Sequence, residues 1–336
     1  MDSSDRYLVV GQNSSPYSMK LRAVMRYRRL PFDWVLRTER NMVEFSDVKP
    51  LLMPMIRFPG EQQCHIDSTP IIDALEQRHP GQRSIIPDSV SHAFLAYLIE
   101  DFADEWLTKA MFHYRWAYDA DVKYASFWIA DDFFPDQKEK ARAAAAKGFA
   151  DRQIERMPLV GCTPENAPII EETYRRTLTL LESHVGLHDY LFGTRPSIAD
   201  FGLFGQLKTM ATDPTPLAIM REQAQRTESW LRQLDDASGI EGTWYPEEEV
   251  QPDATVGLLR LIADTHLPFL VANAIAAQTR DGKLEVELLG QTYSQAAFGY
   301  QVKCLSALRN RFAALDGRSV EQIKPLLEET GCLEYF

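Results

Sequence analysis

The start of the chain constrains the fold most, because it alternates between short buried strands and a helix. Residues 7–11 form an apolar run closed by glycine, which is typical of a buried strand. A polar turn follows over residues 12–16, and apolar residues at helical spacing then predict a helix over residues 17–30. A second strand is expected over residues 32–37. The chain therefore opens as a strand–helix–strand unit.

A strand, a turn and a helix complete this first unit. Residues 51–58 carry Pro54 inside an apolar run, which favours an edge strand or a bent strand. The next helix is expected over residues 68–78, with Ser68 as its N-cap and a proline in its first turn. We therefore expect a small α/β domain over residues 1–86.

Beyond this domain the pattern becomes helical. Residues 169–184 place apolar side chains at helical spacing, and residues 220–234 form one amphipathic stretch. Ser197 and Asp200 form a capping box at the start of an apolar helix. These patterns predict an all-helical domain over residues 90–240.

The last part of the chain, residues 241–336, has its own character. A helix broken at Pro268 is expected over residues 255–278, and residues 284–288 alternate as in a short strand. Two more helices are expected over residues 300–315 and 320–329. Because the apolar faces of this mostly helical C-terminal extension need cover, we expect it to pack against the helical domain.

Charge and cysteine content exclude several classes of protein. The chain has 36 Lys and Arg against 48 Asp and Glu, a net charge of −12, which disfavours nucleic acid as a partner. No run of about 20 apolar residues is present, so a membrane partner is not expected. The four cysteines are scattered without a C-x-x-C pair, which favours a reduced cytoplasmic protein. His184 and His188 lack a third ligand nearby, so no metal is expected.

Four short motifs together resemble those of glutathione transferases, over about residues 6–240. They are Ser15-Pro16-Tyr17-Ser18, Met53-Pro54-Met55, Asp67-Ser68-Thr69-Pro70-Ile71 and Pro196-Ser197-Ile198-Ala199-Asp200. The resemblance implies a thioredoxin-like N-terminal domain and a helical glutathione-transferase C-terminal domain. The extension lies outside the resemblance.

The first motif suits activation of the glutathione thiol. A free thiol has a pKa of about 8.5, and a helix N-terminus with a hydroxyl donor favours its thiolate. Ser15 stands where the helix begins, so we assign it this role, with Ser14, Tyr17 and Ser18 as alternative donors. Ser15 also suits a plain helix cap. Serine cannot form a mixed disulfide, which argues against thiol–disulfide exchange.

The resemblance implies the remaining glutathione contacts. Tyr17 and Ser18 lie beside the thiol, and a cis Met53–Pro54 bond would expose the Met53 backbone for strand-like pairing with the peptide. Ser68 is assigned to the γ-glutamyl carboxylate and Asp67 to the neighbouring amino group. Leu52 stands where many relatives carry Lys or Gln. Either Lys49 or Arg40 is then the partner of the glycine carboxylate, or glutathione binds weakly.

An aromatic cluster over residues 112–128 is the candidate pocket for a hydrophobic electrophile. Tyr114 and Tyr118 are its best candidates, although aromatic stripes also serve as ordinary core.

The sequence therefore predicts a glutathione transferase-like enzyme that uses glutathione as co-substrate and attacks a hydrophobic small molecule. Conjugation, dehalogenation and ether cleavage are all compatible with the motifs, and family membership implies a homodimer. The alternative is a non-catalytic binding or interaction protein that keeps the fold, which Leu52 and the extension favour. Glutathione-dependent reduction would need a nucleophilic cysteine in the site.

Overall fold

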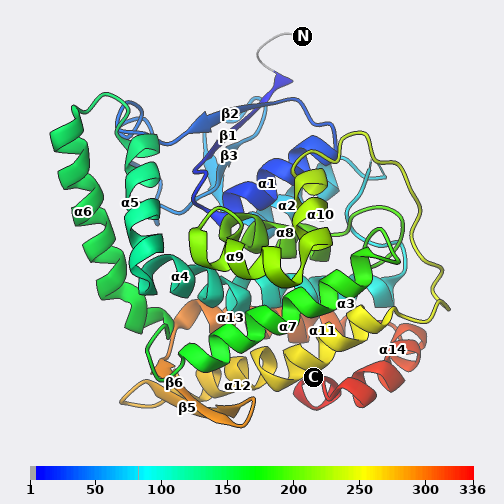
Figure 1. Cartoon of the computed structure of the whole chain (residues 1–336). Helices are drawn as coiled ribbons and strands as arrows, with labels where there is room; N and C mark the ends of the chain where they lie inside the picture. Colours follow the sequence, from blue (N-terminus) through cyan, green and yellow to red (C-terminus); the bar gives the residue numbers. More distant parts are fainter. Residues whose placement is uncertain (1–4, 82) are drawn as a thin grey trace.

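The computed structural model describes residues 5–81 and 83–336, and its first part is an α/β layer at the top of Figure 1. Its elements are β1 (Tyr7–Gly11), α1 (Pro16–Tyr27), β2 (Phe32–Leu36), β3 (Met55–Arg57), β4 (Cys64–Ile66) and α2 (Ser68–Arg78). The predicted strand–helix–strand opening is thus confirmed.

The order and direction of the strands determine which strand ends lie next to one another. The sheet has the order β2-β1-β3-β4, with β1 and β2 parallel and β3 antiparallel to both of its neighbours. Val10 faces Met55, which in turn faces Ile66. The ends of β1, β2 and β4 and the start of β3 therefore share one edge of the sheet.

Two boundaries differ from the sequence-based prediction. The third strand begins only at Met55 and is internal, so Pro54 precedes the strand and the prediction of an edge or bent strand was wrong. A proline has no N–H for a ladder bond, which places it before the paired residues. Asp67, and not Ser68, is the N-cap residue of α2, and its side chain makes no capping hydrogen bond.

The middle of the chain is helical, as predicted. Its elements are α3 (Val90–Phe102), a π-helical turn η2 (Ala103–Leu107), α4 (Thr108–Ala117), α5 (Asp119–Phe133), α6 (Glu139–Arg156), a 3-10 turn η3 (Met157–Val160), α7 (Ala167–Val185), α8 (Ile198–Met210), α9 (Pro214–Gln223) and α10 (Gln225–Asp235). The predicted capping box of Ser197 and Asp200 is present at the start of α8. The helix predicted over residues 220–234 is two helices, broken at Ala224, because the Glu182 carboxylate accepts the first free N–H groups of α10.

Helix α8 is the central support of α1. A Cβ atom at Gly205 would stand 2.6 Å from the Pro16 carbonyl oxygen and 3.1 Å from the Lys20 Cβ. Only glycine therefore allows the start of α1 to approach α8 this closely.

The extension forms a further set of elements along the lower side of Figure 1. They are α11 (Asp253–Asp264), α12 (His266–Ala276), the hairpin of β5 (Lys283–Leu288) and β6 (Gln291–Ala296), α13 (Gly299–Ala313), α14 (Gly317–Thr330) and a final 3-10 turn η4 (Leu333–Tyr335). The expected helix break lies at Thr265, because Pro268 is tolerated in the first turn of α12. Strand β6, with its polar composition, was not predicted.

The extension shares one hydrophobic core with the rest of the chain. Leu258, Ile262 and Leu270 are fully buried in the same cluster as core residues of α1, α3 and α8. The stretch Asp253–Ala276 is apolar and long enough to cross a membrane, but here it is two helices, largely buried in that core. The extension is therefore part of the folded body.

A buried lysine lies where the extension meets the helical segment. Lys109 stands over the rings of Trp106, Phe269 and Tyr293, at 5.7, 4.5 and 5.8 Å from their centroids. Its ammonium donates to Gln295 Oε1 at 2.9 Å and to the Val160 carbonyl at 3.0 Å. Burial lowers the pKa of Lys109 to about 8.

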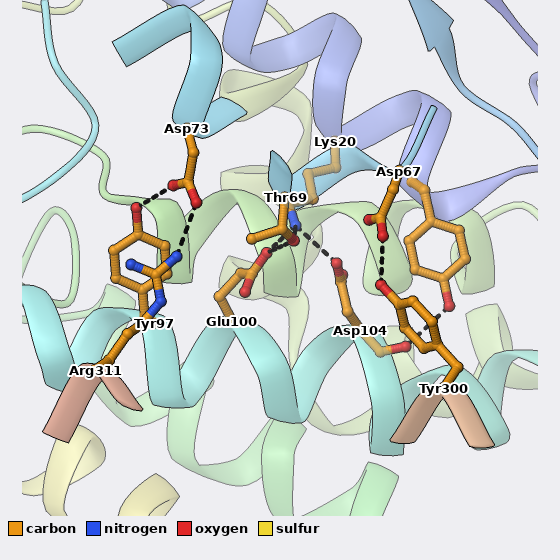
Figure 2. A network of polar contacts seen from close by, with 10 residues as sticks. Lys20, Asp67, Thr69, Asp73, Tyr97, Glu100, Asp104, Tyr300 and Arg311 are labelled. Atoms are coloured by element: carbon orange, nitrogen blue, oxygen red, sulfur yellow. Dashed lines mark hydrogen bonds and ion pairs between the residues drawn. The ribbon is translucent and has the colours of Figure 1, made fainter. Parts of the chain in front are cut away.

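A second buried lysine joins the sheet layer to the helices (Figure 2). Lys20 of α1 is wholly buried and pairs with Glu100 and, at 2.7 Å, with Asp104. Thr69 of α2 donates to the same Glu100 oxygen at 2.6 Å. Burial opposes the charged ammonium, but Asp104 and Glu100 outweigh it and raise the pKa of Lys20. This network fixes α1 and α2 against α3.

Removing the charge of Lys109 should remove a pH dependence of stability. Its pKa lies at about 8 in the folded chain against about 10.4 when unfolded, so wild-type stability should rise as the pH increases between these values. Relative to Lys109→Met, the wild type should gain about 2 kcal/mol between pH 7 and pH 10, measured by urea unfolding. The control variant Lys303→Met, at an exposed site, should differ from the wild type in stability by the same amount at pH 7 and at pH 10. If the stability difference between the wild type and Lys109→Met were also independent of pH, the lowered pKa of Lys109 would be contradicted.

Removing the charge of Lys20 should be far more damaging. Lys20→Met leaves two buried carboxylates without a cation, which should cost about 3–5 kcal/mol of unfolding free energy at pH 8. The loss should shrink as the pH falls toward 5, because the unpaired carboxylates can then protonate. Lys147→Met removes an exposed ion pair with Asp151 and should cost less than about 1 kcal/mol. Equal losses in both variants would contradict this account of the network.

Candidate functional site

Ser15 lies where the shared edge of the sheet meets the start of α1. It is the N-cap residue of α1, and its Oγ accepts the Ser18 N–H at 3.3 Å. Its own hydroxyl proton has no acceptor among the hydrogen bonds of the described residues. The side chain is half-buried. Ser15 therefore caps the helix and still has a proton to donate to a ligand.

The neighbouring hydroxyl groups are differently placed. Ser18 is fully buried, and its Oγ accepts the Gln12 N–H at 3.2 Å, which stabilises the turn. Ser14 is held through its carbonyl, which accepts from Arg115 at 2.8 Å. Tyr17 donates to the Asp104 carbonyl at 2.9 Å and lies 3.2 Å from Thr108 Oγ1.

The Tyr17 hydroxyl is held as a neutral phenol. Burial, followed by the nearby Glu105 and Asp104 carboxylates, raises its pKa well above the ordinary value. Tyr17 therefore joins the start of α1 to the helical domain, and its proton is already committed to that domain.

The proline motif lies at the same sheet edge. The Met53–Pro54 bond is cis, as expected, and directly precedes β3. Leu52 is 47% exposed. Of the two cations expected near the glycine carboxylate, Arg40 forms an ion pair with Asp136. Lys49 is exposed and lines a cavity of about 490 Å³ together with residues of β4 and α2.

Arg37 is a cation that the sequence analysis missed. It follows β2 directly, and its backbone N–H donates to the Gly11 carbonyl at 3.0 Å. Its Nε is buried without a hydrogen-bond partner, and no ion pair involves Arg37 within residues 5–81 and 83–336. Burial lowers its pKa. The sequence signal that could have identified Arg37 is its position, as a basic residue directly after a strand that ends at the shared edge of the sheet.

Asp67 and Ser68 complete the edge, after β4. Asp67 has a left-handed backbone with φ of +75°, and its Oδ2 accepts from the Tyr300 hydroxyl at 2.6 Å (Figure 2). Ser68 is the first residue of α2 and is 3% exposed. Because the first N–H groups of a helix have no partner within it, Ser68 offers a donor site for a carboxylate. The contact with Tyr300 was not predicted from the sequence.

The two predicted pocket tyrosines lie at the end of α4, with Tyr114 inside the helix and Tyr118 directly after it. Tyr114 is fully buried, stacks on Tyr118 at 5.8 Å and meets the Tyr174 ring at 5.2 Å. The Tyr118 hydroxyl hydrogen-bonds to Glu171, and burial, with Glu171, raises its pKa to about 12. Both tyrosines line a cavity of about 380 Å³, whose lining residues come from α4, α7 and α9 and their flanking turns. The structure thus brings Tyr114 and Tyr118 together, apart from the sheet edge.

The candidate metal ligands and the cysteines show no further site. His184 and His188 stack with ring centroids 4.9 Å apart. Across the described part of the chain, no group of three or more His, Cys, Asp or Glu side chains could hold a metal ion. Cys162, Cys304 and Cys332 are buried free thiols, and burial raises the pKa of each.

Several solved structures are similar to this chain. A GST-like protein from Pseudomonas syringae is 14% identical, with a TM-score of 0.41 and coverage of 68% of this chain and 66% of that protein. The beta-etherase LigF from Sphingobium sp. strain SYK-6 is 18% identical, with a TM-score of 0.47 and coverage of 68% and 94%. A glutathione S-transferase from Methylobacterium radiotolerans, in complex with glutathione sulfonate, is 16% identical, with a TM-score of 0.42 and coverage of 74% and 98%. No curated protein matches the sequence.

Two family models match the sequence at the places where the fold has its sheet layer and its helices. The model described as glutathione S-transferase, N-terminal domain, matches residues 10–83. The model described as glutathione S-transferase, C-terminal domain, matches residues 138–233. Together they cover about half of the chain, in the expected order, and the extension lies beyond both. The chain therefore belongs to the glutathione S-transferase family and is a transferase-like enzyme.

Proposed function

We propose that the chain binds glutathione along the shared sheet edge and activates its thiol for attack on a hydrophobic electrophile. The observation that carries the proposal is the state of Ser15, whose Oγ accepts the Ser18 N–H while its own proton has no acceptor among the described residues. A hydroxyl in this state, at a helix N-terminus, can donate to an anion that binds beside it.

The chemistry requires a thiolate at neutral pH. The Ser15 hydroxyl and the positive end of α1 both favour the charged sulfur over the protonated thiol. The thiolate sulfur then forms a bond to an electrophilic carbon. In a displacement, the bond to a halide or an ether oxygen breaks and the leaving group departs with the electron pair. In an addition to a double bond, no group leaves: the π electron pair moves to the atom next to the attacked carbon, and that atom takes up a proton. Positioning of the two reactants supplies much of the rate.

The other residues of the edge would hold the tripeptide. Ser68, at the start of α2, would bind the γ-glutamyl carboxylate, and Asp67 would accept from the adjacent ammonium. The Met53 backbone, just before β3, would pair with the cysteinyl unit as an added strand. Arg37 would bind the glycine carboxylate, because Arg40 is engaged by Asp136 and the Lys49 side chain is exposed beside the cavity of β4 and α2.

The electrophile is the open part of the proposal. Tyr17 and Ser18 lie beside Ser15 in the active-site turn, and Tyr114 and Tyr118 line the cavity of about 380 Å³ between α4, α7 and α9. We keep both tyrosines as candidates for contact with a hydrophobic small molecule. A homodimer and a cytoplasmic location remain predictions that follow from family resemblance and from cysteine usage.

A second candidate is a non-catalytic binding protein with the same fold. It is favoured by Leu52, which is exposed at a place where many relatives are expected to carry Lys or Gln. This alternative is a binding or interaction protein that keeps the fold but does not turn over a substrate.

Replacing Ser15 should separate turnover from binding. Ser15→Ala should lower the rate with glutathione and chlorodinitrobenzene about 10- to 100-fold, because one hydrogen bond to a charged sulfur is lost. The calorimetric Kd for glutathione should change much less. The exposed Ser183→Ala serves as the control. An unchanged rate in Ser15→Ala would mean that Ser15 serves only as a helix cap. Absence of turnover in the wild type would favour the non-catalytic binding protein.

Replacing Arg37 should weaken the binding of glutathione by removing a contact at the glycine end of the peptide. Arg37→Gln should raise the Kd for glutathione about tenfold or more, since a charge-assisted hydrogen bond is lost. The Kd for γ-glutamylcysteine, which lacks the glycine, should not change. Arg40→Gln is the matched control and should have little effect, because that side chain is paired with Asp136 at the surface. If Arg40→Gln raised the Kd for glutathione and Arg37→Gln did not, the assignment of the glycine carboxylate to Arg37 would be wrong.

A further inference from the structure

The peptide unit that joins Ser14 to Ser15 has a partner for each of its polar groups. The Ser15 N–H donates to the Gln12 carbonyl at 3.1 Å, within the turn of residues 12–15. The Ser14 carbonyl accepts from Arg115 Nη1 at 2.8 Å. On the other side of the residue, the Ser15 carbonyl accepts the Met19 N–H at 3.1 Å. Because the peptide unit is planar and is held at both of its polar groups, the backbone from which the Ser15 hydroxyl projects has a fixed direction.

Arg115 makes its contact with this peptide unit from the helical domain. It is a buried residue in the last turn of α4. Its Nε donates to Asp213 Oδ2 at 2.7 Å, and Asp213, the N-cap residue of α9, is fully buried. The guanidinium carbon lies 5.8 Å from the centre of the Trp128 ring of α5. The guanidinium therefore binds α9 through one nitrogen and the turn of residues 12–15 through another.

The helical domain makes a second contact with the same turn. The Asn13 side-chain amide donates to Asp132 Oδ2 of α5 at 3.0 Å. Residue 13 is thus joined to α5 and residue 14 to α4. The position of the turn that precedes α1 therefore depends on the helical domain as well as on the sheet.

We infer that Arg115 is a positioning residue for Ser15, because it sets the orientation of the Ser14–Ser15 peptide and so the direction in which the Ser15 hydroxyl points. The inference rests on the proposed function, since it concerns the hydroxyl that would donate to the glutathione thiolate. Hydrogen bonds weaken steeply when they are misaligned, and small displacements of a catalytic group lower rates strongly. Arg115 acts through the turn and does not itself contact the ligand.

The test uses Arg115→Lys, which keeps a positive charge beside the buried Asp213 carboxylate. A lysine ammonium is a single point charge and cannot reproduce two separate nitrogens, so the contact with the Ser14 carbonyl should be lost. Removing the charge altogether would leave Asp213 buried without a cation and would endanger the fold. The matched control is Arg176→Lys, at an exposed ion pair with Glu172. Melting temperatures near that of the wild type would confirm that both variants are folded.

The main measurement is the pKa of the thiol of bound glutathione, followed by the ultraviolet absorbance of the thiolate over a series of pH values. In the wild type this pKa should lie below the ordinary value of about 8.5. Arg115→Lys should raise it, lower the rate with chlorodinitrobenzene about tenfold, and leave the Kd for glutathione nearly unchanged. Added to Ser15→Ala, the same substitution should leave the pKa in place and change the rate less than about twofold, because Arg115 acts through Ser15. Arg176→Lys should match the wild type throughout.

Two results would overturn the inference in distinguishable ways. If Arg115→Lys changes the pKa and the rate equally with and without the Ser15 hydroxyl, or changes neither, Arg115 only joins α4 to α9 and to the turn. If the wild type does not bind glutathione at millimolar concentration, or binds it without lowering the pKa of its thiol, the proposed function fails and this inference fails with it. If the wild type lowers that pKa but shows no turnover, the pKa of the variants alone decides.

Discussion

The pairing of Lys20 with Glu100 and Asp104 is the interaction on which the geometry of the site depends. A fully buried ammonium holds α1 to α3, and Thr69 adds the start of α2 through the same Glu100 oxygen. Ser15 caps α1 and Ser68 begins α2, so this network fixes both helix N-termini relative to one another. Breaking a buried pair is costly because the remaining charges cannot return to water, which makes the arrangement rigid.

The extension belongs to the same physical unit. Its helices α11 and α12 supply fully buried residues to the common core, and Lys109 lies in a cage of aromatic rings shared with η2 and β6. From this anchored base, α13 reaches Asp67 through Tyr300 and Asp73 through Arg311, which lies over the Tyr97 ring (Figure 2). An extension that did not share the core could not hold these side chains against the first domain so firmly.

Much of the fold and of the site edge was readable from local sequence. A strand, a helix or a capping box depends on residues close together in the chain, so β1, β2 and the Ser197–Asp200 box were predicted correctly. Helix boundaries and contacts that depend on residues far away in the sequence were not predicted. The break at Ala224 depends on Glu182, and the contact of Asp67 with Tyr300 joins residues 233 positions apart. Arg37 was missed because only the folded chain shows that it has no ion-pair partner among residues 5–81 and 83–336.

The central claim is that glutathione lies along the shared edge with its sulfur at Ser15. A crystal structure of the chain with bound glutathione tests it most directly. We expect the sulfur within about 3 Å of Ser15 Oγ, the γ-glutamyl carboxylate at the start of α2, and the ammonium beside Asp67. A peptide bound in the cavity between α4, α7 and α9, or one whose sulfur points away from Ser15, would contradict the claim.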